Sequence, residues 1–492
     1  MFTCGEQIYA MKGVDMDNKK REAQFLNIPT MKNERQYGFG DAALVNSGWA
    51  IATWCFLTGG LTASLVDFQT AIITAFAGNF IGVAIMLIAE ISTTVKYGVD
   101  TYPTLVSFLG KNGMKILLVF FIVINIGWVA VLSAMLSNAV QNIFTEVTGR
   151  DTGAVFYTVI AIAAVLLSWL LVFKGLKAIQ WLNRIVVPCL AFTMIVMLWA
   201  IFHKYGMNAV FSASPIAPYD NDTLNVILAL ELNVGAGLSW WASLGSLTRT
   251  TKTAGGAMWA NWVGVGTLGT VAVLLGAAAA YVIGGSDPTE WMIPLGGVVL
   301  GIIALIFVGI GNVSSNAIVM YATCLGMKQY KFFANMSWLK VTTIFAIPVI
   351  LLEFIPEFLY GNYQILLNGS AAFFSSLAAV QIVDFLILRR QHFDLRAIYS
   401  NSSDSDYYFW KGVNWGGLGC VIIGGLTYCL LLNPLTWEYS DMLLVFKSAS
   451  LSGFVVAFVL YLIYAKLVLM PMKKGGLQEH KTYYKAIGKQ GY

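Results

Sequence analysis

Two short stretches decide the fold: NSGWAIAT at residues 46–53 and NVGAGLS at residues 233–239. They lie in the middle of the first and the sixth long apolar runs, where an intact helix has no need of glycine. Glycine costs about 1 kcal/mol relative to alanine inside a helix, so each stretch indicates a helix break or a close packing of helices. Broken helices at corresponding positions of two five-helix halves are typical of inverted-repeat transporters, whose substrate lies at the breaks.

The composition is that of a polytopic membrane protein. Of the 492 residues, 58% are hydrophobic and only 11% are charged, with 30 Lys and Arg against 25 Asp and Glu. A soluble domain carries about 25% charged residues, so a water-soluble globule and a nucleic-acid-binding protein are both excluded. A helix needs about 20 apolar residues to cross a bilayer, and the chain has room for many such spans.

Twelve apolar runs are long enough to cross a membrane, which predicts an all-α polytopic membrane protein with twelve transmembrane helices. They lie at residues 42–63, 71–92, 115–144, 154–173, 183–202, 224–246, 257–284, 293–325, 335–355, 358–388, 412–433 and 444–470. Lys and Arg gather in every second connection, such as residues 174–184 and 249–252, whereas the other connections carry acids such as Asp287 and Glu290. Since Lys and Arg stay on the cytoplasmic side, we expect both termini in the cytoplasm and a multi-pass protein of the plasma or inner membrane.

The most specific motifs lie between residues 366 and 415. They read DFLILRR at 384–390, DLRAIY at 394–399 and YFWKGVNW at 408–415, and weaker matches are KYGVD at 96–100 and Gly127-Trp128. In these motifs the chain resembles the nucleobase:cation symporter family, class 1, which includes cytosine, purine, allantoin and hydantoin permeases. The resemblance extends over most of the chain, from about residue 35 to about residue 432.

That resemblance implies the LeuT-like fold, with two inverted five-helix repeats, two further helices, and breaks in spans one and six. The expected parts are a cytoplasmic N-terminal segment at 1–40, repeats at 41–203 and 204–390, a loop with two helices at 391–470, and a basic cytoplasmic tail at 471–492. It also implies a secondary active transporter that imports a small planar nitrogen heterocycle by alternating access. An enzyme is not expected, because the three His residues lie outside the apolar runs, and no metal or cofactor is expected either.

The resemblance implies a substrate site that is built from spans one, three, six and eight. The residues expected there are Ala52, Trp54, Trp128, Leu132, Ala236, Gly237, Ser239, Asn312 and Asn316. A planar ring needs a flat aromatic partner, and its N–H and C=O groups need side chains that both donate and accept, as asparagine does. The alternatives are ordinary packing for Trp128 and hydrogen bonding between helices for the two asparagines.

The expected site departs from relatives at two positions. The family's hydantoin transporter has a tryptophan where this chain has Gly237, so a second aromatic wall would come from Trp54, Trp240 or Trp241. Each of these three could instead pack in the bundle or face lipid. Leu132 replaces a polar glutamine of some relatives, which predicts a drier wall on that side.

The coupling cation is expected to be a proton rather than sodium. The resemblance implies a sodium site made by main-chain carbonyls near Gly48 and Ile51 and by two hydroxyls in span eight. In this chain Ile310 and Gly311 occupy the hydroxyl positions. A carboxyl group inside a membrane is costly and commonly functional, so Glu231, just before the sixth-span glycines, is the expected coupling group. The alternative is a permanently paired structural acid.

Two other acids lie in apolar runs, and two other functions fit the same scaffold. We expect Glu90 to pair with a cation near the cytoplasmic end of span two, and Asp384 to form a tether with the neighbouring Arg389 and Arg390. The alternative functions are a sodium-coupled symporter of the same substrates, and an amine or amino-acid transporter in which Glu231 would neutralise the substrate.

Overall fold

The computed structural model describes residues 25–285, 287–400 and 402–477, and the regular elements in these ranges are helices. Within the described ranges, nine helical segments are long and apolar enough to cross a membrane. They are α5 (Phe68–Tyr97), α8 (Lys111–Thr148), α9 (Ala154–Lys174), α10 (Leu176–Tyr205), α12 (Asp222–Leu238) with α13 (Trp241–Thr248), α14 (Ala254–Asn261) with η2 (Trp262–Leu268) and α15 (Gly269–Ile283), α16 (Pro288–Met327), α20 (Tyr363–Ile382) with η3 (Val383–Leu388), and α24 (Ala449–Tyr464) with η5 (Ala465–Leu469).

The remaining predicted spans correspond to shorter apolar helices. The first run is the pair α3 (Phe39–Ala50) and α4 (Thr53–Leu65), and two others are α18 (Trp338–Leu352) and α22 (Trp415–Leu431). Each of the twelve predicted runs therefore falls on one helix or on consecutive helices. The number of membrane crossings stays a prediction. The expectations for residues 1–24 and 478–492, which belong to the two predicted cytoplasmic ends, lie outside the described residues. The division into repeats also stays a prediction.

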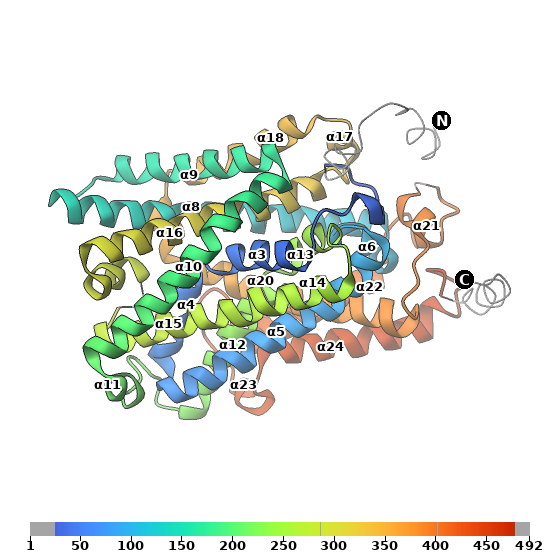
Figure 1. Ribbon diagram of the computed structural model, residues 1–492. Coiled ribbons are helices and arrows are strands. Elements are labelled where there is room, and N and C mark those ends of the chain that lie inside the picture. The colour runs from blue at the N-terminus through green and yellow to red at the C-terminus, as the bar shows by residue number, and fades with distance from the viewer. Residues whose placement is uncertain (1–24, 286, 401, 478–492) are drawn as a thin grey trace.

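Short helices connect the spans: η1 (Lys32–Glu34), α6 (Thr101–Thr104), α7 (Val106–Leu109), α11 (Met207–Phe211), α17 (Lys331–Ala334), α19 (Pro356–Gly361), α21 (Leu395–Tyr399), η4 (Asp406–Tyr408) and α23 (Asp441–Phe446). In Figure 1, α6, α17 and α21, which follow or belong to basic connections, lie at one end of the molecule, and α11 lies at the other. This placement agrees with the alternation of connections that the sequence predicts.

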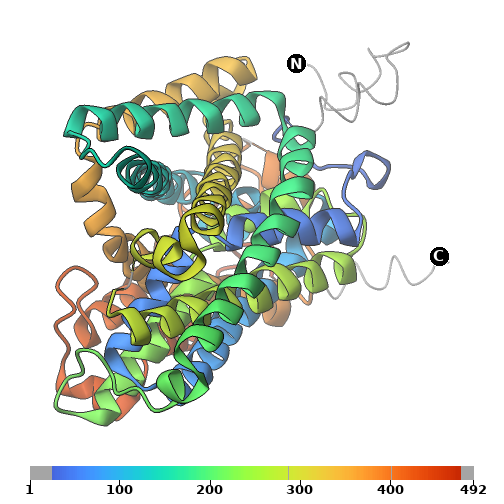
Figure 2. The same ribbon diagram turned by 60° about the vertical axis from the view of Figure 1, so that its left-hand side comes forward.

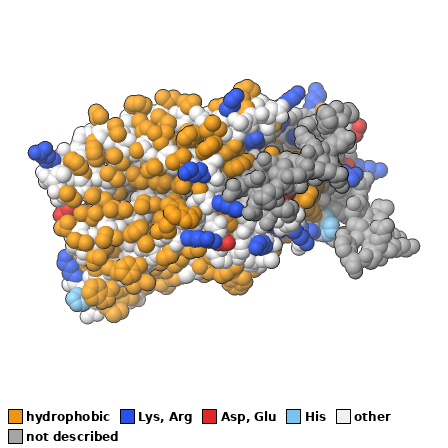
Figure 3. Space-filling model, turned by 45° about the horizontal axis from the view of Figure 1, so that its top comes forward, with side chains coloured by type: hydrophobic (Ala, Val, Ile, Leu, Met, Phe, Trp, Pro, Cys, Tyr) orange, Lys and Arg blue, Asp and Glu red, His pale blue; other side chains and the backbone are white. Residues whose placement is uncertain are grey.

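The long helices form two groups with the broken helix between them. Figure 1 shows α8, α9 and α18 along one side, α5, α12 and α24 along the other, and α3 and α13 between them; Figure 2 again shows α9 and α18 together at one margin. Hydrophobic side chains cover most of the described face in Figure 3. Val155, Leu430 and Val299 are 78%, 76% and 71% exposed, as expected for side chains that face lipid.

The predicted break in the first span is present between α3 and α4. Ile51 (φ −90°, ψ 86°) and Ala52 (φ −135°, ψ 171°) leave the helical region, and α4 then begins at Thr53. Ala52 precedes α4 at the position where Ser, Thr, Asp or Asn would cap the first free N–H groups, and its methyl group cannot do so. The cap of α4 must come from another helix.

The interruption of the sixth span lies later than the sequence predicts. Gly235 and Gly237 are helical residues of α12, and the interruption falls at Ser239 and Trp240, which keep right-handed helical angles. The glycines serve close packing instead: a Cβ atom on Gly237 would lie 2.5 Å from the carbonyl oxygen of Asn79 on α5. The backbones of α12 and α5 therefore touch, which the sequence pattern alone could not distinguish from a break.

The seventh span contains a π-helical segment, η2, whose cause is a side chain of α5. Asn79 donates its amide to the carbonyl oxygens of Val265 (2.9 Å) and Gly266 (3.0 Å) and to the Thr270 hydroxyl (2.8 Å). A π segment shifts the i→i−4 ladder and frees carbonyls, and the Asn79 amide hydrogen-bonds to them. One buried amide thus ties α5 to the seventh span beside the interruption of the sixth.

Candidate functional site

Three side chains of α16 form hydrogen bonds around the break between α3 and α4, with partners on α3, α4 and α10. The Asn312 Oδ1 accepts the N–H of Thr53 (3.0 Å), and its Nδ2 donates to the Thr53 hydroxyl (2.9 Å). The Ser315 hydroxyl donates to the carbonyl of Trp49 (2.7 Å), and the Ser314 hydroxyl donates to Asn183 of α10 (2.9 Å). Asn312 therefore caps α4 from another helix, and this use of its amide favours the sequence alternative of hydrogen bonding between helices.

Asn316 lies one turn further along α16 and faces α8. Its Nδ2 donates to the hydroxyl of Ser133 (2.8 Å), but its Oδ1 is buried without a hydrogen-bond partner among the described residues. Trp128, earlier on α8, donates its indole N–H to the Ser370 hydroxyl of α20 (3.2 Å), and its side chain is only 8% exposed. An unpaired buried acceptor costs about 1 to 3 kcal/mol, and the role of Asn316 in substrate binding stays a prediction.

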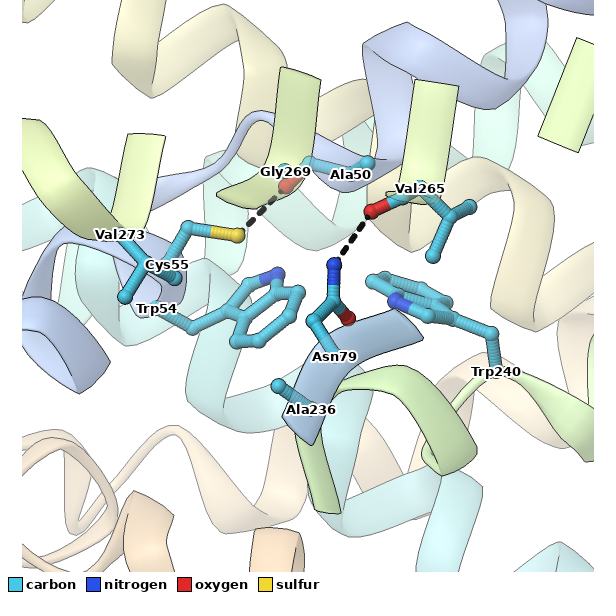
Figure 4. Close-up of a pocket in the computed structure, with 9 residues that line it drawn as sticks. All are labelled: Ala50, Trp54, Cys55, Asn79, Ala236, Trp240, Val265, Gly269 and Val273. Carbon is cyan, nitrogen blue, oxygen red and sulfur yellow. Dashed lines mark hydrogen bonds between the residues drawn. The ribbon is translucent and has the colours of Figure 1, made fainter. Parts of the chain in front are cut away.

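Three indole rings gather where α3, α4 and α13 meet. The ring centroids of Trp49 and Trp240 are 4.5 Å apart, and those of Trp54 and Trp240 are 5.5 Å apart. All three indole N–H groups are buried without partners among the described residues. Figure 4 shows Trp54 and Trp240 on opposite sides of a small pocket, with Asn79 and Ala236 between them. The sequence analysis proposed Trp54 and Trp240 as aromatic walls but missed Trp49, although its place beside Gly48 at the break was a signal.

The other predicted substrate residues lie in different positions around this centre. Ala236 lines the pocket in Figure 4, and Ala52 is buried at the first break. Gly237 packs against α5, and the Ser239 hydroxyl donates to the carbonyl of Ala236 (2.9 Å). Leu132 is buried on α8, one turn beyond Trp128, and its place in the wall of a substrate site stays a prediction.

Trp241 is not part of the indole cluster. Its ring packs against Phe121 and Phe374, and its N–H donates to Gln381 of α20 (3.2 Å). Of the two adjacent tryptophans that follow Ser239, only Trp240 therefore faces the pocket. A helical turn of about 100° per residue separates them, and the sequence could not tell which one pointed inward.

The residues near the implied sodium site do not offer sodium a full set of oxygen ligands. Gly311 has no side chain and lies against the Ile51 carbonyl, since a Cβ atom there would be 2.7 Å from that oxygen. Gly48 packs against the Asn183 amide, which accepts the Ser314 hydroxyl proton. The hydroxyls of Ser314 and Ser315 donate hydrogen bonds to Asn183 and to the Trp49 carbonyl, and Ile310 is a hydrocarbon. Sodium prefers several oxygen ligands, and the two implied hydroxyl ligands are missing at Ile310 and Gly311.

Glu231 faces α24 rather than the indole cluster. Its carboxylate accepts hydrogen bonds from the Ser448 hydroxyl, from the Ser450 hydroxyl (2.7 Å) and from the Ser450 N–H (3.1 Å). These donors belong to the first turn of α24, where free N–H groups and the helix dipole favour a negative charge. The contact matches the paired structural acid that the sequence left as the alternative, and the coupling role of Glu231 stays a prediction.

Asp384 forms the tether that its motif predicts. Its carboxylate accepts a charge-assisted hydrogen bond from Arg389 (2.6 Å) and further bonds from the hydroxyls of Ser107 (2.7 Å) and Tyr461 (3.0 Å). Both charged side chains are buried, so the pair links η3, α7 and α24 at the end of the molecule where α21 lies. Arg390 is not part of this ion pair.

Solved structures with the same architecture are transporters. The chain aligns with an inward-facing conformation of Mhp1 at a TM-score of 0.75 and 19% identity, covering 93% of this chain and 97% of that one. A closed conformation of Mhp1, described as a nucleobase-cation-symport-1 family transporter with bromovinylhydantoin bound, gives a TM-score of 0.73 at 18% identity, with 90% and 95% coverage. At these identities the likeness shows the fold, which is LeuT-like as predicted.

Curated relatives and a family model agree with the structural likeness. The cytosine permease of Escherichia coli (strain K12) is 25% identical over 389 residues, which are 77% of this chain and 87% of that protein. The hydantoin permease of Microbacterium maritypicum is 21% identical over 415 residues, covering 80% and 81%. Residues 40–456 match the family described as permeases for cytosine/purines, uracil, thiamine and allantoin. The protein is thus a multi-pass membrane transporter and not an enzyme, and it belongs to the cytosine/purine permease family, the nucleobase:cation symporter family 1.

Proposed function

We propose that this transporter imports a small planar nitrogen heterocycle, of the nucleobase, allantoin or hydantoin type, by alternating access and with a proton as the coupling cation. The single observation that carries the substrate class is the unpaired Oδ1 of Asn316, on the helix that caps the first break and bonded through its amide to Ser133 of α8, the helix that carries Trp128. A ring N–H of such a substrate would donate to this oxygen. We further propose that the protein lies in the plasma or inner membrane, with both termini in the cytoplasm.

Stacking would not use a gap between two rings of the indole cluster, because no such gap is wide enough. A planar ring between two others needs about 7 Å between the outer centroids, twice a carbon–carbon contact distance. The Trp49–Trp240 and Trp54–Trp240 pairs are 4.5 Å and 5.5 Å apart, so neither pair can hold a ring in this conformation. We therefore assign the two walls to Trp128 on α8 and Trp240 on the opposite group of helices.

Alternating access would move the two groups of helices relative to each other. Gly82 and Gly237 bring the backbones of α5 and α12 into direct contact, since a Cβ atom on Gly82 would lie 2.4 Å from the Val234 carbonyl oxygen. These two helices would then move as one body against α8 and α16. Trp128 and Asn316 belong to one body and Trp240 to the other, so a bound ring would favour their approach.

A heterocycle fits the site better than an amine or an amino acid. A cationic amine needs an acid at the site, and Glu231, the acid that the sequence offered, is hydrogen-bonded to the start of α24. A proton fits better than sodium, because Ile310 and Gly311 supply no side-chain oxygen as a ligand. The hydroxyls of Ser314 and Ser315 are hydrogen-bonded to Asn183 and to the Trp49 carbonyl. A proton needs a titratable group and no preformed set of oxygen ligands.

Ligand-induced stabilisation of the purified protein tests the substrate class. A ligand that binds the folded state raises the melting temperature, and the rise grows with the logarithm of its concentration relative to its Kd. Cytosine, uracil, adenine, allantoin and hydantoin are therefore compared, at equal concentrations, with choline and phenylalanine. We expect stabilisation by at least one heterocycle and by neither control compound. The Asn316→Ala variant should lose this stabilisation while remaining folded. Stabilisation by choline or phenylalanine alone would contradict the proposal.

A further inference from the structure

The carboxyl group of Glu90 is buried inside the helix bundle without a counter-charge. Glu90 lies late in α5 and has no exposed surface. Its two oxygens accept hydrogen bonds from the Thr101 hydroxyl (2.8 Å) and from the Gln381 amide (2.8 Å). Among the described residues no Lys, Arg or His lies within ion-pair distance of it, so the cation that the sequence analysis expected is not its partner.

Both oxygens of Glu90 are connected to α13, the half-helix after the interruption. The Thr101 hydroxyl that donates to Oε2 accepts the N–H of Gly245 (3.0 Å). The Gln381 amide that donates to Oε1 accepts the indole N–H of Trp241 (3.2 Å) through its own oxygen. The contact is also direct, because a Cβ atom on Gly245 would lie 2.9 Å from Oε2 of Glu90. Trp241 is adjacent to Trp240, so this network ends next to the indole cluster.

Two buried acids, Glu90 and Asp100, lie close together here, and among the described residues only Asp100 faces a cation. Asp100 and Tyr102, from the segment around α6, are the titratable groups that face it. Arg249, at the end of α13, is the cation that faces Asp100, and it is also hydrogen-bonded to Tyr321 of α16. From α20 the neighbour is the neutral Gln381. A buried carboxylate without a counter-charge inside a membrane protein is costly, and binding a proton removes that cost.

We propose that Glu90 is the proton-binding group of transport, with α13 as the element whose position it controls. This inference rests on the proposed function. With a proton bound, the neutral carboxyl group is compatible with the dry contact against Gly245. After α13 moves away from α5, water reaches the carboxyl group from the end where α6 lies, and the proton leaves there. Because substrate at Trp240 and proton at Glu90 act on the same half-helix, each favours binding of the other.

Glu231 provides the contrast within the same protein. Its carboxyl group accepts hydrogen bonds from two hydroxyls and from a main-chain N–H at the start of α24. Among the described residues it has no hydrogen bond to α13. Glu231 therefore lacks the link to the half-helix that Glu90 has.

The test compares Glu90→Gln with two matched variants of buried acids, Glu231→Gln and Glu353→Gln. Glu353 is buried at the end of α18, and neither Glu231 nor Glu353 is bonded to α13. Infrared spectra during a pH titration report the C=O stretch of protonated carboxyl groups. We expect the wild-type spectrum to contain one titrating band that is missing from the spectrum of Glu90→Gln and present in those of Glu231→Gln and Glu353→Gln. Identical titrating bands in the wild type and in Glu90→Gln would overturn the proposal.

Uptake into proteoliposomes gives the second readout, with labelled cytosine, uracil and hydantoin as separate probes. Glu90→Gln should still exchange labelled for unlabelled probe, but an imposed proton gradient should no longer raise the internal concentration above the external one. Glu231→Gln and Glu353→Gln should keep gradient-driven accumulation. Accumulation by Glu90→Gln, or its loss in Glu231→Gln alone, would overturn the assignment. If the wild type transports none of the probes, the proposed function fails, and the infrared titration still decides whether Glu90 binds a proton.

A positioning variant covers the case in which Glu90→Gln does not fold. Gln381→Met removes the amide that links Glu90 to Trp241 while keeping the length of the side chain. We expect exchange of probe to continue and the pH midpoint of gradient-driven uptake to shift. An unchanged pH profile would overturn the link between Glu90 and α13.

Discussion

Asn312 and Asn316 lie one turn apart on α16, yet the first has both amide atoms bonded to Thr53 and the second keeps a buried oxygen without a partner among the described residues. The same residue type on the same helical face therefore does two different things. Asn312 holds the broken first span together, and we propose that Asn316 binds the ligand. The first two predictions separate these roles.

Replacement of Asn312 by alanine should destabilise the ligand-free protein. The N–H of Thr53, at the start of α4, would lose its cap in a buried place, at a cost of about 1 to 3 kcal/mol. Asn312→Asp keeps an acceptor for that N–H and should cost less. The melting temperature in detergent measures the effect, and Asn335→Ala, at an exposed asparagine, serves as the control. Equal melting temperatures for Asn312→Ala and the wild type would contradict the capping role.

Replacement of Asn316 by alanine should weaken substrate binding more than it lowers stability. Only the bond to Ser133 is lost in the ligand-free protein, whereas a bound ring would lose its acceptor. We expect an affinity loss worth about 1 to 3 kcal/mol, measured by calorimetry with the heterocycle that stabilises the wild type. An unchanged affinity would return Asn316 to a purely structural role.

Trp128 should be needed for its ring rather than for its hydrogen bond. Trp128→Ala removes the stacking face and should abolish uptake, while Trp128→Phe keeps a smaller face and should retain part of it. Ser370→Ala removes only the partner of the indole N–H and should leave uptake close to the wild-type level. Initial uptake rates measure all three variants. If Ser370→Ala were as inactive as Trp128→Ala, positioning of the ring would be the cause.

Uptake should be indifferent to sodium. Ile310 and Gly311 stand where the implied sodium site has two hydroxyl residues. The nearby hydroxyls of Ser314 and Ser315 are hydrogen-bonded to Asn183 and to the Trp49 carbonyl. Replacement of sodium by potassium or choline should leave the initial rate unchanged, while an inward proton gradient should raise it. A sodium gradient that drives accumulation at constant pH would show that the site reorganises to bind the ion.

The orientation in the membrane is tested at the two ends of α9. Asp151 and Lys174 are both exposed and flank the same helix. Asp151→Cys should react with an impermeant thiol reagent in intact cells, and Lys174→Cys should react only after permeabilisation. The reverse pattern would invert the predicted topology.

The sequence by itself determined the positions of the spans and of the first break. Long apolar runs fall on helices because a backbone in hydrocarbon must satisfy its hydrogen bonds within the helix, a requirement that depends only on local composition. The motifs between residues 366 and 415 identified the family, and the family model matches residues 40–456. The tether of Asp384 to Arg389 was also predictable, because both residues belong to the DFLILRR motif that identified the family.

Tertiary structure decided which polar groups meet. Asn312 and Thr53 are 259 positions apart, and Glu231 and Ser450 are 219 apart, so no local pattern connects them. The glycines of α12 could mean a break or a close contact, and only the backbone of α5 against Gly237 distinguishes the two. Glu90 was expected to pair with a cation, but the fold places Thr101, Gln381 and α13 around it. Hydrophobic pattern is encoded along the chain, whereas hydrogen-bond partners are fixed only when distant helices pack.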